Sequence, residues 1–245
     1  MKAVVVIPTY DEADALESIL DRLFEVAPGF DVLVVDDNSP DGTGRIAEDY
    51  GRRNGRVSVL HRPGKLGLGS AYRDGFRRVL ADGADAVFEM DADHSHNPRY
   101  LPAMRRRLET DLDLVIGSRY VNGVRVENWP FRRLLLSRFA NIYVNWSTGL
   151  PASVVSDATS GFRGYRREVL EAIGLDRVRS AGFAFQVEMK YRALRKGFRI
   201  EEVPIIFVDR QVGTSKMSRQ ILIEGLARVW QIRSRVRREE REKGG

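Results

Sequence analysis

The chain has 245 residues, a formal charge of +6 and 43% hydrophobic residues, which suit one large α/β domain with a full core. It contains no cysteine, so disulfides, thiolate metal sites and cysteine nucleophiles are excluded. No segment makes a convincing transmembrane helix, and the apolar N-terminal run meets Pro8 too soon for a signal peptide. We therefore expect a soluble protein or one bound to a membrane surface.

Strands and helices alternate through the first half of the sequence. Apolar runs rich in β-branched residues predict buried strands at 3–7, 31–35, 57–60, 86–90 and 112–116. Helical spacing of apolar residues predicts helices at 13–26, 43–50, 68–80 and 99–108, with Asp11 capping the first and Asn97 and Pro98 beginning the last. The alternation predicts a parallel sheet with helices on both faces.

The second half of the sequence is less regular. It predicts helices at 131–146, 183–196 and 219–236, a short strand at 162–165, and an extended segment at 199–208. Residues 233–245 carry half of the net positive charge, which predicts either a solvated helix end or attraction to an anionic membrane. Because no repeat or linker interrupts the chain, we expect a single domain over residues 1–245.

Two carboxylates one residue apart, Asp91 and Asp93, follow the predicted strand at 86–90. Open α/β sheets bind ligands outside the carboxyl ends of their strands. Two oxygen ligands there suit Mg²⁺ or Mn²⁺, which in turn holds phosphate oxygens. The pair predicts a metal-held nucleotide diphosphate, or simply two turn aspartates at the end of a strand.

Polar motifs also follow the first two predicted strands, PTYDE at 8–12 and VVDDNSPDGT at 34–43. An acidic residue at the end of the second strand is well placed for a ribose or a base, whereas NSPDGT is also typical of a turn before a helix cap. The segment 65–71, KLGLGSA, is a weak glycine-loop signal. The chain lacks a P-loop and a GxGxxG after its first strand, which argues against P-loop NTPases and dinucleotide dehydrogenases.

The ordered set PTYDE, VVDDNSPDGT, GKLGLGSAY, MDADHSHNP and GSRY resembles the GT-A nucleotide-diphospho-sugar transferases of glycosyltransferase family 2. Residues 126–129 and 133–137, SDATSGFRGYRREVL at 156–170 and FVDRQVGTSK at 207–216 resemble the dolichol-phosphate and polyprenol-phosphate mannosyltransferases of that family. The resemblance spans about residues 2–216. It implies a Rossmann-like GT-A fold with a mostly parallel central sheet.

The same resemblance implies an inverting transfer of mannose from GDP-mannose to a dolichyl or polyprenyl phosphate. Residues 1–120 would then form the donor half, 121–216 the acceptor half, and 217–245 a C-terminal helix with a basic tail. Residue by residue, the resemblance implies the following sets. The donor would be bound by Pro8, Tyr10, Glu12, Val35, Asp37, Asp91, Ala92, Asp93, Arg119, Arg210 and Lys216. The acceptor phosphate would be bound by Arg119, Arg133, Ser137 and Arg210. The catalytic set would be Asp91, Asp93, Arg119, Arg210 and Lys216.

The implied cofactor is a divalent metal, Mg²⁺ or Mn²⁺, on Asp91 and Asp93. Ser95 would be a weaker third ligand, acting through a water, because relatives often carry Gln there. A phosphate acceptor is already an anion at neutral pH and needs no general base. It needs cations instead, because two anions about 4 Å apart repel by about 4 kcal/mol at an effective dielectric constant of about 20.

The predicted helix at 131–146 places Leu135, Phe139, Ile142 and Trp146 on one face. That face is either ordinary core or an interface with a bilayer, and Arg133 and Ser137 on the same segment favour the bilayer. A second docking helix is expected at 221–232. We expect an enzyme peripheral to the cytoplasmic face of a membrane, acting alone or with a separate membrane-anchoring subunit.

Three alternatives stay open. The chain uses UDP-glucose or another donor, delivers its sugar to a hydroxyl acceptor, or is a non-catalytic nucleotide-sugar-binding module. A hydroxyl acceptor would require a catalytic base, for which the sequence offers no clear candidate. No nucleic-acid partner is expected, because aromatic-rich binding motifs are missing.

Overall fold

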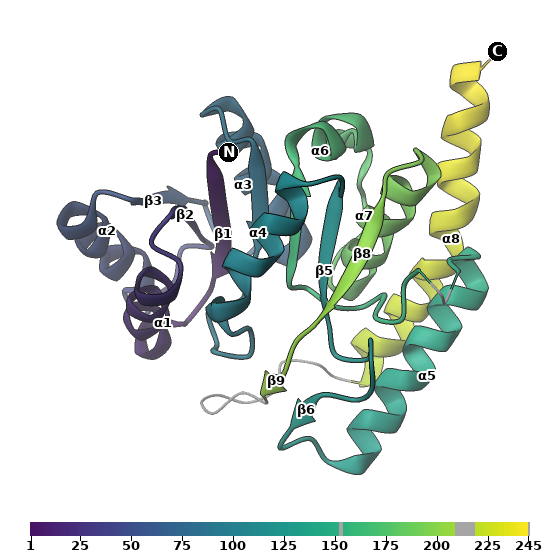
Figure 1. The fold of residues 1–245 in the computed structure, drawn as a ribbon, viewed down its shortest axis with the longest axis horizontal. Helices are drawn as coiled ribbons and strands as arrows, with labels where there is room; N and C mark the ends of the chain where they lie inside the picture. Colours follow the sequence, from purple (N-terminus) through teal and green to yellow (C-terminus); the bar gives the residue numbers. More distant parts are fainter. Residues whose placement is uncertain (152–153, 209–218, 245) are drawn as a thin grey trace.

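The computed structural model describes residues 1–151, 154–208 and 219–244, and for residues 219–227 and 243–244 the backbone alone (Figure 1). A seven-stranded sheet in the order β3-β2-β1-β4-β7-β5-β8 forms its centre. These strands are β1 (Ala3–Thr9), β2 (Phe30–Asp36), β3 (Val57–His61), β4 (Ala86–Glu89), β5 (Leu114–Ser118), β7 (Arg163–Arg166) and β8 (Ile200–Pro204). Neighbouring strands are parallel except for β7, which runs antiparallel to β4 and β5. The predicted mostly parallel α/β sheet is confirmed.

Helices cover both faces of this sheet because its central strands are apolar on both sides. On one face, Val5 and Ile7 of β1 pack in a core with the helices α1 (Ala13–Val26), α2 (Thr43–Asn54) and α4 (Leu101–Glu109). On the other face, Val4 and Val6 pack with α3 (Leu68–Ala81), α6 (Arg167–Ile173) and α7 (Phe183–Arg195). Short 3-10 turns precede α4 (Pro98–Tyr100) and follow α6 (Leu175–Arg177).

Two longer helices, α5 (Phe131–Thr148) and α8 (Arg219–Gly244), lie side by side beyond the last strands of the sheet (Figure 1). A third core joins them to α7 through Val144, Tyr191, Val229 and Ile232. The extended segment predicted at 199–208 divides into β8 and β9 (Phe207–Val208), and β9 pairs with β6 (Val126–Glu127). None of the helices in the described part of the chain has an apolar stretch long enough to cross a membrane.

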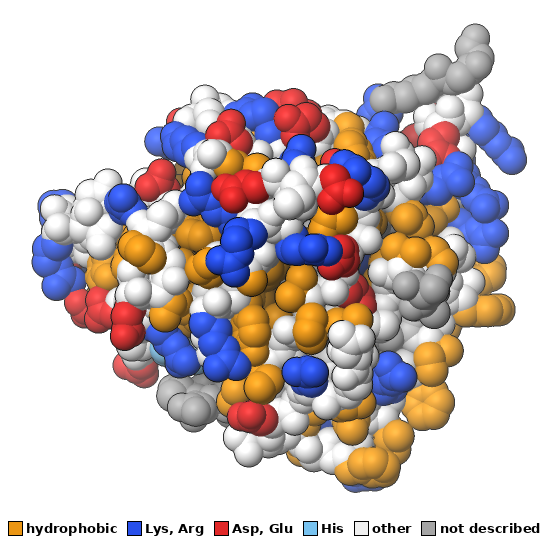
Figure 2. Space-filling view, viewed as in Figure 1, with side chains coloured by type: hydrophobic (Ala, Val, Ile, Leu, Met, Phe, Trp, Pro, Cys, Tyr) orange, Lys and Arg blue, Asp and Glu red, His pale blue; other side chains and the backbone are white. Residues whose placement is uncertain are grey.

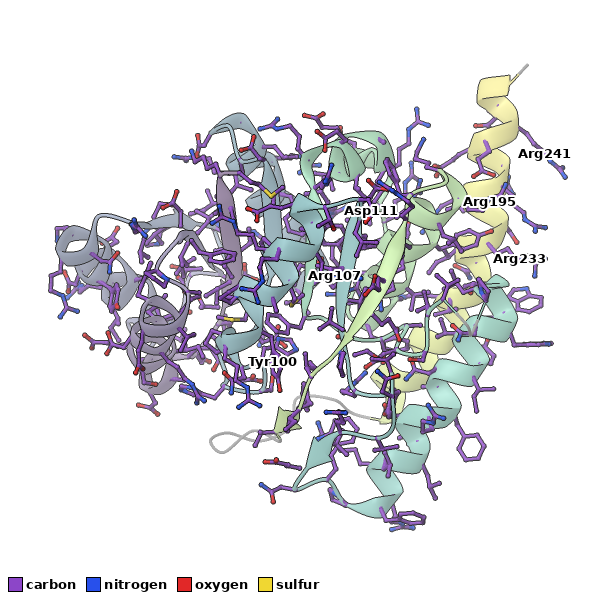
Figure 3. All side chains as sticks on the ribbon, in the orientation of Figure 1. Tyr100, Arg107, Asp111, Arg195, Arg233 and Arg241 are labelled. Atoms are coloured by element: carbon purple, nitrogen blue, oxygen red, sulfur yellow. The ribbon has the colours of Figure 1, made fainter. Side chains whose placement is uncertain are left out.

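The helix α8 continues past the predicted end at residue 236, because acidic side chains of the tail pair with arginines of α7. Glu239 bonds to Arg192 at 2.8 Å, and Glu240 bonds to Arg195 at 2.6 Å. Figure 3 labels Arg195 on α7, close beside α8. The basic C-terminal segment is therefore docked on the protein over these residues rather than being only a frayed end.

The predicted cap of α1 was wrong. Asp11 makes no cap; the Ala13 N–H donates instead to the carboxylate of Asp41 at 3.0 Å, and the Glu12 N–H donates to the Thr43 hydroxyl at 3.0 Å. The loop after β2 thus packs over the free N–H groups of α1, which sequence proximity does not reveal. Asn97 and Pro98 were predicted to begin the helix at 99–108; Asn97 caps the 3-10 turn before α4, where its side chain accepts from the Arg99 N–H at 3.1 Å.

Candidate active site

Three strand ends on one edge of the sheet carry residues in the left-handed region. Asp11, Asn38 and His94 follow β1, β2 and β4 with φ values of +56°, +56° and +61°. Non-glycine residues seldom adopt this conformation, and they concentrate at functional sites. The turns bend the chain away from the sheet and leave the preceding polar residues around a cavity.

This first cavity has a volume of about 420 Å³, which suits a small-molecule ligand. Its wall comes from the ends of β1, β2 and β4, the segment before and within the start of α3, and the residue before α7. The lining residues are Pro8, Thr9, Tyr10, Glu12, Asp37, Lys65, Gly67, Leu68, Ala71, Asp91, Ala92, Asp93 and Gly182. Seven of the predicted donor-binding residues lie among them: Pro8, Tyr10, Glu12, Asp37, Asp91, Ala92 and Asp93.

Asp91 and Asp93 follow the carboxyl end of β4 and are held by different contacts. The Asp91 side chain is 33% exposed and accepts a hydrogen bond from the Tyr72 hydroxyl at 3.4 Å. Asp93 is nearly buried and accepts from the Ser95 N–H at 3.0 Å. Among the described residues no cluster of three or more acidic, histidine or cysteine side chains could hold a metal. Two carboxylates nevertheless fit Mg²⁺ or Mn²⁺, which commonly completes its shell with phosphate oxygens and water.

Ser95 itself does not line this cavity. It is buried, and the bond it makes is the backbone one that fixes Asp93. Its predicted role as a weak metal ligand through a water stays a prediction.

Asp37 both lines the cavity and anchors the loop before α3. Its carboxylate accepts from Arg62 at 2.6 Å and from the Leu66 N–H at 3.1 Å. The loop so fixed places the Lys65 ammonium 3.8 Å from the centre of the Tyr10 ring, a close cation–π contact at the cavity wall. Lys65 was missed as a site residue, although the KLGLGSA segment was its signal.

Two glycines of that segment explain its composition. Gly67 has a φ of +94°, and a Cβ on Gly69 would lie 2.9 Å from the Ser180 carbonyl oxygen. Only glycine therefore lets α3 begin so close to the segment before α7.

Val35, a predicted donor-binding residue, is fully buried against α3 and does not line the cavity, so its side chain is not brought to this site.

A second cavity of about 210 Å³ lies on the other side of the start of α7. Its wall combines cationic, aromatic and small hydroxyl side chains from five separate segments. The lining residues are Arg119, Trp129, Arg133, Leu136, Ser137, Ala140, Thr159, Phe183 and Phe207. The structure thus brings together Arg119, Arg133 and Ser137, three of the four predicted acceptor residues. Arg119 does not line the first cavity, so its predicted contact with the donor is not seen.

Arg119 is oriented by a buried carboxylate that sequence analysis missed. Its guanidinium bonds to both carboxylate oxygens of Asp157, at 2.8 and 2.6 Å, and to the Thr159 hydroxyl at 2.8 Å. Burial disfavours charge on Asp157, yet the Arg119 guanidinium holds the pKa of that carboxyl below its usual range. The buried pair is therefore ionised at neutral pH, which fixes the direction of the Arg119 side chain.

Aromatic rings frame both arginines of the second cavity. The Arg119 guanidinium lies 5.5 Å from the ring centres of Trp129 and Phe207, and that of Arg133 lies 4.3 Å from Trp129. Ser137 accepts from the Tyr120 hydroxyl at 2.6 Å. Arg210 and Lys216 lie outside the residues that the structure describes, and their roles stay predictions.

The two cavities meet at the start of α7, where Gly182 lines the first and Phe183 lines the second. The first has the acidic pair of the β4 end, and the second has the two arginines. This adjacency places an anion bound in the second cavity next to a ligand held in the first.

The predicted apolar face of α5 is exposed rather than buried. Phe139, Ile142 and Trp146 are 66%, 61% and 70% exposed, and Leu135 is exposed as well. Trp146 also lies 5.8 Å from the exposed Trp230 of α8, measured between ring centres. Figure 2 shows hydrophobic side chains along the edge that α5 occupies at the lower right. We call Leu135, Phe139, Ile142, Trp146 and Trp230 the apolar strip.

Of the second docking helix expected at 221–232, the side chains of 221–227 lie outside those that the structure describes, and the rest needs a correction. Val229 and Ile232 are buried against α5 and α7, so among the side chains described in that segment Trp230 contributes the exposed apolar surface. Helical spacing alone did not separate the two faces, because the exposed Trp230 stands between the buried Val229 and Ile232.

The family model described as Glycosyl transferase family 2 matches residues 4–174. A polyprenol monophosphomannose synthase of Mycolicibacterium smegmatis is 45% identical over 240 residues, which cover 97% of this chain and 89% of that protein. An undecaprenyl-phosphate mannosyltransferase of Micrococcus luteus is 46% identical over 237 residues, covering 96% of each chain.

Solved structures share the fold at lower identity. A glucosyl-3-phosphoglycerate synthase from Mycobacterium tuberculosis, in complex with Mn²⁺ and UDP, aligns with a TM-score of 0.67 and 19% identity over 96% of this chain and 79% of its own. A mannosyltransferase from Pyrobaculum calidifontis in complex with GDP-Man and Mn²⁺ aligns with a TM-score of 0.63 and 18% identity over 94% and 64%. These similarities show the fold, the predicted GT-A arrangement.

Proposed function

The chain belongs to glycosyltransferase family 2, and on that premise we propose that it transfers mannose from GDP-mannose to a polyprenyl or dolichyl phosphate. One observation carries the proposal. A cavity with the acidic pair Asp91 and Asp93 adjoins a cavity with two arginines, and one wall residue of that second cavity, Leu136, is also part of the exposed apolar surface of α5. Such a site suits a nucleotide sugar on one side and a lipid-borne anion on the other.

The first cavity would hold the donor. Tyr10, Glu12 and Asp37 surround the nucleotide, and Lys65 supplies a cation at the wall. Asp91 and Asp93 would hold Mg²⁺ or Mn²⁺, which neutralises negative charge on the departing GDP. Both solved structures named above contain Mn²⁺ together with a nucleotide or a nucleotide sugar.

The second cavity would hold the acceptor phosphate. Arginine binds phosphate bidentately, and Arg119 is already aligned by Asp157. No Asp, Glu or His lines this cavity among the described residues, so a hydroxyl acceptor would find no base here. An acceptor that arrives ionised therefore fits better than a sugar hydroxyl.

The reaction follows from this placement. An oxygen of the lipid phosphate attacks the anomeric carbon of mannose as the bond from that carbon to GDP breaks, and GDP leaves with the electron pair. A single displacement inverts the configuration at the anomeric carbon. Among the residues that the structure describes, Arg119 and Arg133 offset the repulsion between the two phosphates. Arg210 and Lys216 would add to that charge.

The lipid chain would reach a bilayer along the apolar strip. Leu136 belongs to both the cavity wall and the exposed surface of α5, so an acceptor phosphate in the cavity has apolar surface directly beside it. A basic helix with tryptophan at its end favours the membrane interface. Peripheral attachment at the cytoplasmic face, with or without a separate anchoring subunit, is part of this proposal.

The test is a matrix of donors and acceptors. Purified protein is given radiolabelled GDP-mannose or UDP-glucose with a short polyprenyl phosphate, the same polyprenol without phosphate, or no acceptor, each with Mg²⁺, Mn²⁺ or a chelator. We expect labelled lipid from GDP-mannose and the phosphate only, and none with the chelator. Product from UDP-glucose or from the free polyprenol would contradict the proposal, as would GDP-mannose binding without transfer.

A further inference from the structure

His96 stands in the loop after β4, and neither cavity includes it in its wall. Its side chain is buried, with the residue 2% exposed. The Asp91 N–H donates to His96 Nδ1 at 3.1 Å. In this contact Nδ1 is the acceptor. The imidazole therefore fixes the backbone of Asp91, the first residue of the acidic pair.

The ring of His96 is held between two aromatic side chains. It stacks on Phe162 with ring centres 5.1 Å apart and an interplanar angle of 12°, and it meets Phe207 edge-on at 5.7 Å and 74°. Aromatic contacts of this geometry contribute about 0.5–1.5 kcal/mol beyond the burial of area. The ring position is thus set by Phe162, just before β7, and by Phe207 of β9, together with the hydrogen bond to its own loop.

A second contact ties the same loop to the β8–β9 connection. The Ile206 N–H donates to the Tyr100 hydroxyl at 3.0 Å, one residue before Phe207. Figure 3 places Tyr100 between the start of α4 and β9. The segment between β4 and α4, which bears Asp91, and the segment that leads into β9 are therefore joined at two points.

Phe207 continues the connection into the second cavity. Its ring lies 5.5 Å from that of Trp129 and 5.5 Å from the Arg119 guanidinium. A continuous series of contacts runs from Asp91 through His96 and Phe207 to Arg119. It links the acidic pair of one cavity to the arginine of the other.

We propose that His96 is a positioning residue that aligns Asp91 for a metal-bound nucleotide through Nδ1 and supports the Phe207 wall of the acceptor cavity through its ring. The inference rests on the proposed function for the identity of the two ligands. The hydrogen bond to Nδ1 and the packing of the ring are two separate interactions, so we test each with its own substitution. His96→Phe keeps a ring between Phe162 and Phe207 but leaves the Asp91 N–H without its acceptor. His96→Asn keeps an acceptor at nearly the position of Nδ1 but removes the ring.

The experiment measures Mn²⁺ affinity in the presence of GDP by calorimetry, and the KM for polyprenyl phosphate, in the wild type and both variants. For His96→Phe we expect the Mn²⁺ affinity to fall about 10-fold or more, as for other residues that orient metal ligands, with the acceptor KM within about threefold. For His96→Asn we expect Mn²⁺ affinity within about threefold and an acceptor KM raised about 10-fold. Thermal unfolding of each variant shows whether the fold is kept.

If His96→Phe bound Mn²⁺ as tightly as the wild type, the proposed alignment of Asp91 by His96 would be wrong. Equal losses of both quantities in both variants would mean that His96 only fills space, and would overturn the proposal whether or not the variants are less stable. A wild type that binds Mn²⁺ and GDP but transfers no mannose would defeat the proposed function and leave the alignment by His96 standing. A wild type that binds neither would overturn both.

Discussion

The two cavities of this protein are built in different ways. The first consists of short loops that directly follow parallel strands, so its polar groups are carried by contiguous motifs and placed by the backbone of the sheet. The second consists of side chains from distant segments, and a buried ion pair between Arg119 and Asp157 orients its central cation. A backbone-built cavity should tolerate substitution except at the reacting groups, whereas a side-chain-built cavity should be sensitive at residues that touch no ligand.

The largest effect is expected at the acidic pair. Asp91→Ala or Asp93→Ala should lower mannose transfer at least about 100-fold, because each removes a metal-binding carboxylate. The melting temperature should change little for Asp91→Ala, since that side chain is partly exposed. Transfer assays and thermal unfolding measure both, with the exposed Asp14→Ala of α1 as the matched control. Undiminished transfer in either variant would remove the metal role.

Asp157→Asn tests whether the second cavity depends on a residue that contacts no ligand. Removing one partner of a buried pair leaves the other charge uncompensated, so we expect a loss of about 3 kcal/mol in the free energy of unfolding. Transfer should fall while affinity for GDP stays unchanged. Denaturant unfolding, transfer assays and calorimetry measure the three quantities. A loss of GDP affinity equal to the loss of transfer would contradict the separation of the cavities.

The same pair predicts a pH dependence. The folded pKa of Asp157 lies below its usual value of 3.8, so its carboxylate stabilises the fold fully above that pH. The difference in unfolding free energy between the wild type and Asp157→Asn should stay constant from pH 7 to about 5. It should shrink as the pH falls below 3.8 and through the lower folded pKa. A difference that grows on acidification would mean that Asp157 is protonated in the folded protein.

Arg133→Ala should raise the KM for polyprenyl phosphate about 10-fold, because it removes one charge-assisted contact to the phosphate. The affinity for GDP should stay unchanged. The neighbouring Arg132→Ala is the matched control, since Arg132 is exposed and does not line the cavity. Steady-state kinetics with varied acceptor measure the effect. Equal KM values in the two variants would place the acceptor phosphate elsewhere.

The smallest effect is expected at the apolar strip. Phe139→Ser should weaken binding to vesicles about 10-fold, since burial of a Phe side chain contributes about 1.5–3 kcal/mol. Transfer to a short acceptor in solution should be unchanged. Co-sedimentation with vesicles measures binding, and Leu66→Ser is the control because Leu66 is similarly exposed at a distant loop. A Phe139→Ser variant that binds vesicles like the wild type would remove the strip from the membrane contact.

Sequence predicted the first cavity far better than the second. The strands around Val5 and Val34 are continuous apolar runs, and the motifs at their ends follow from the rule that parallel strands share a ligand-binding edge. Asp157 and Phe207 could not be assigned in this way, because the long-range pairing of β7 and β9 places them. The apolar face of α5 was predictable as a pattern, but its exposure follows only from which helices pack on α7.

One detail of the sheet has a wider consequence. Because β7 is antiparallel to its neighbours, the residues that enter it arrive at the edge where β4 and β5 finish, and this brings Asp157 to Arg119. The approach to β7, in which Val155, Asp157 and Ala158 are buried, lies outside the strand pairing that orders the sheet. Insertions or deletions there would retune the acceptor side while the nucleotide side keeps its geometry, so an enzyme of this architecture can acquire new acceptors without rebuilding its donor chemistry.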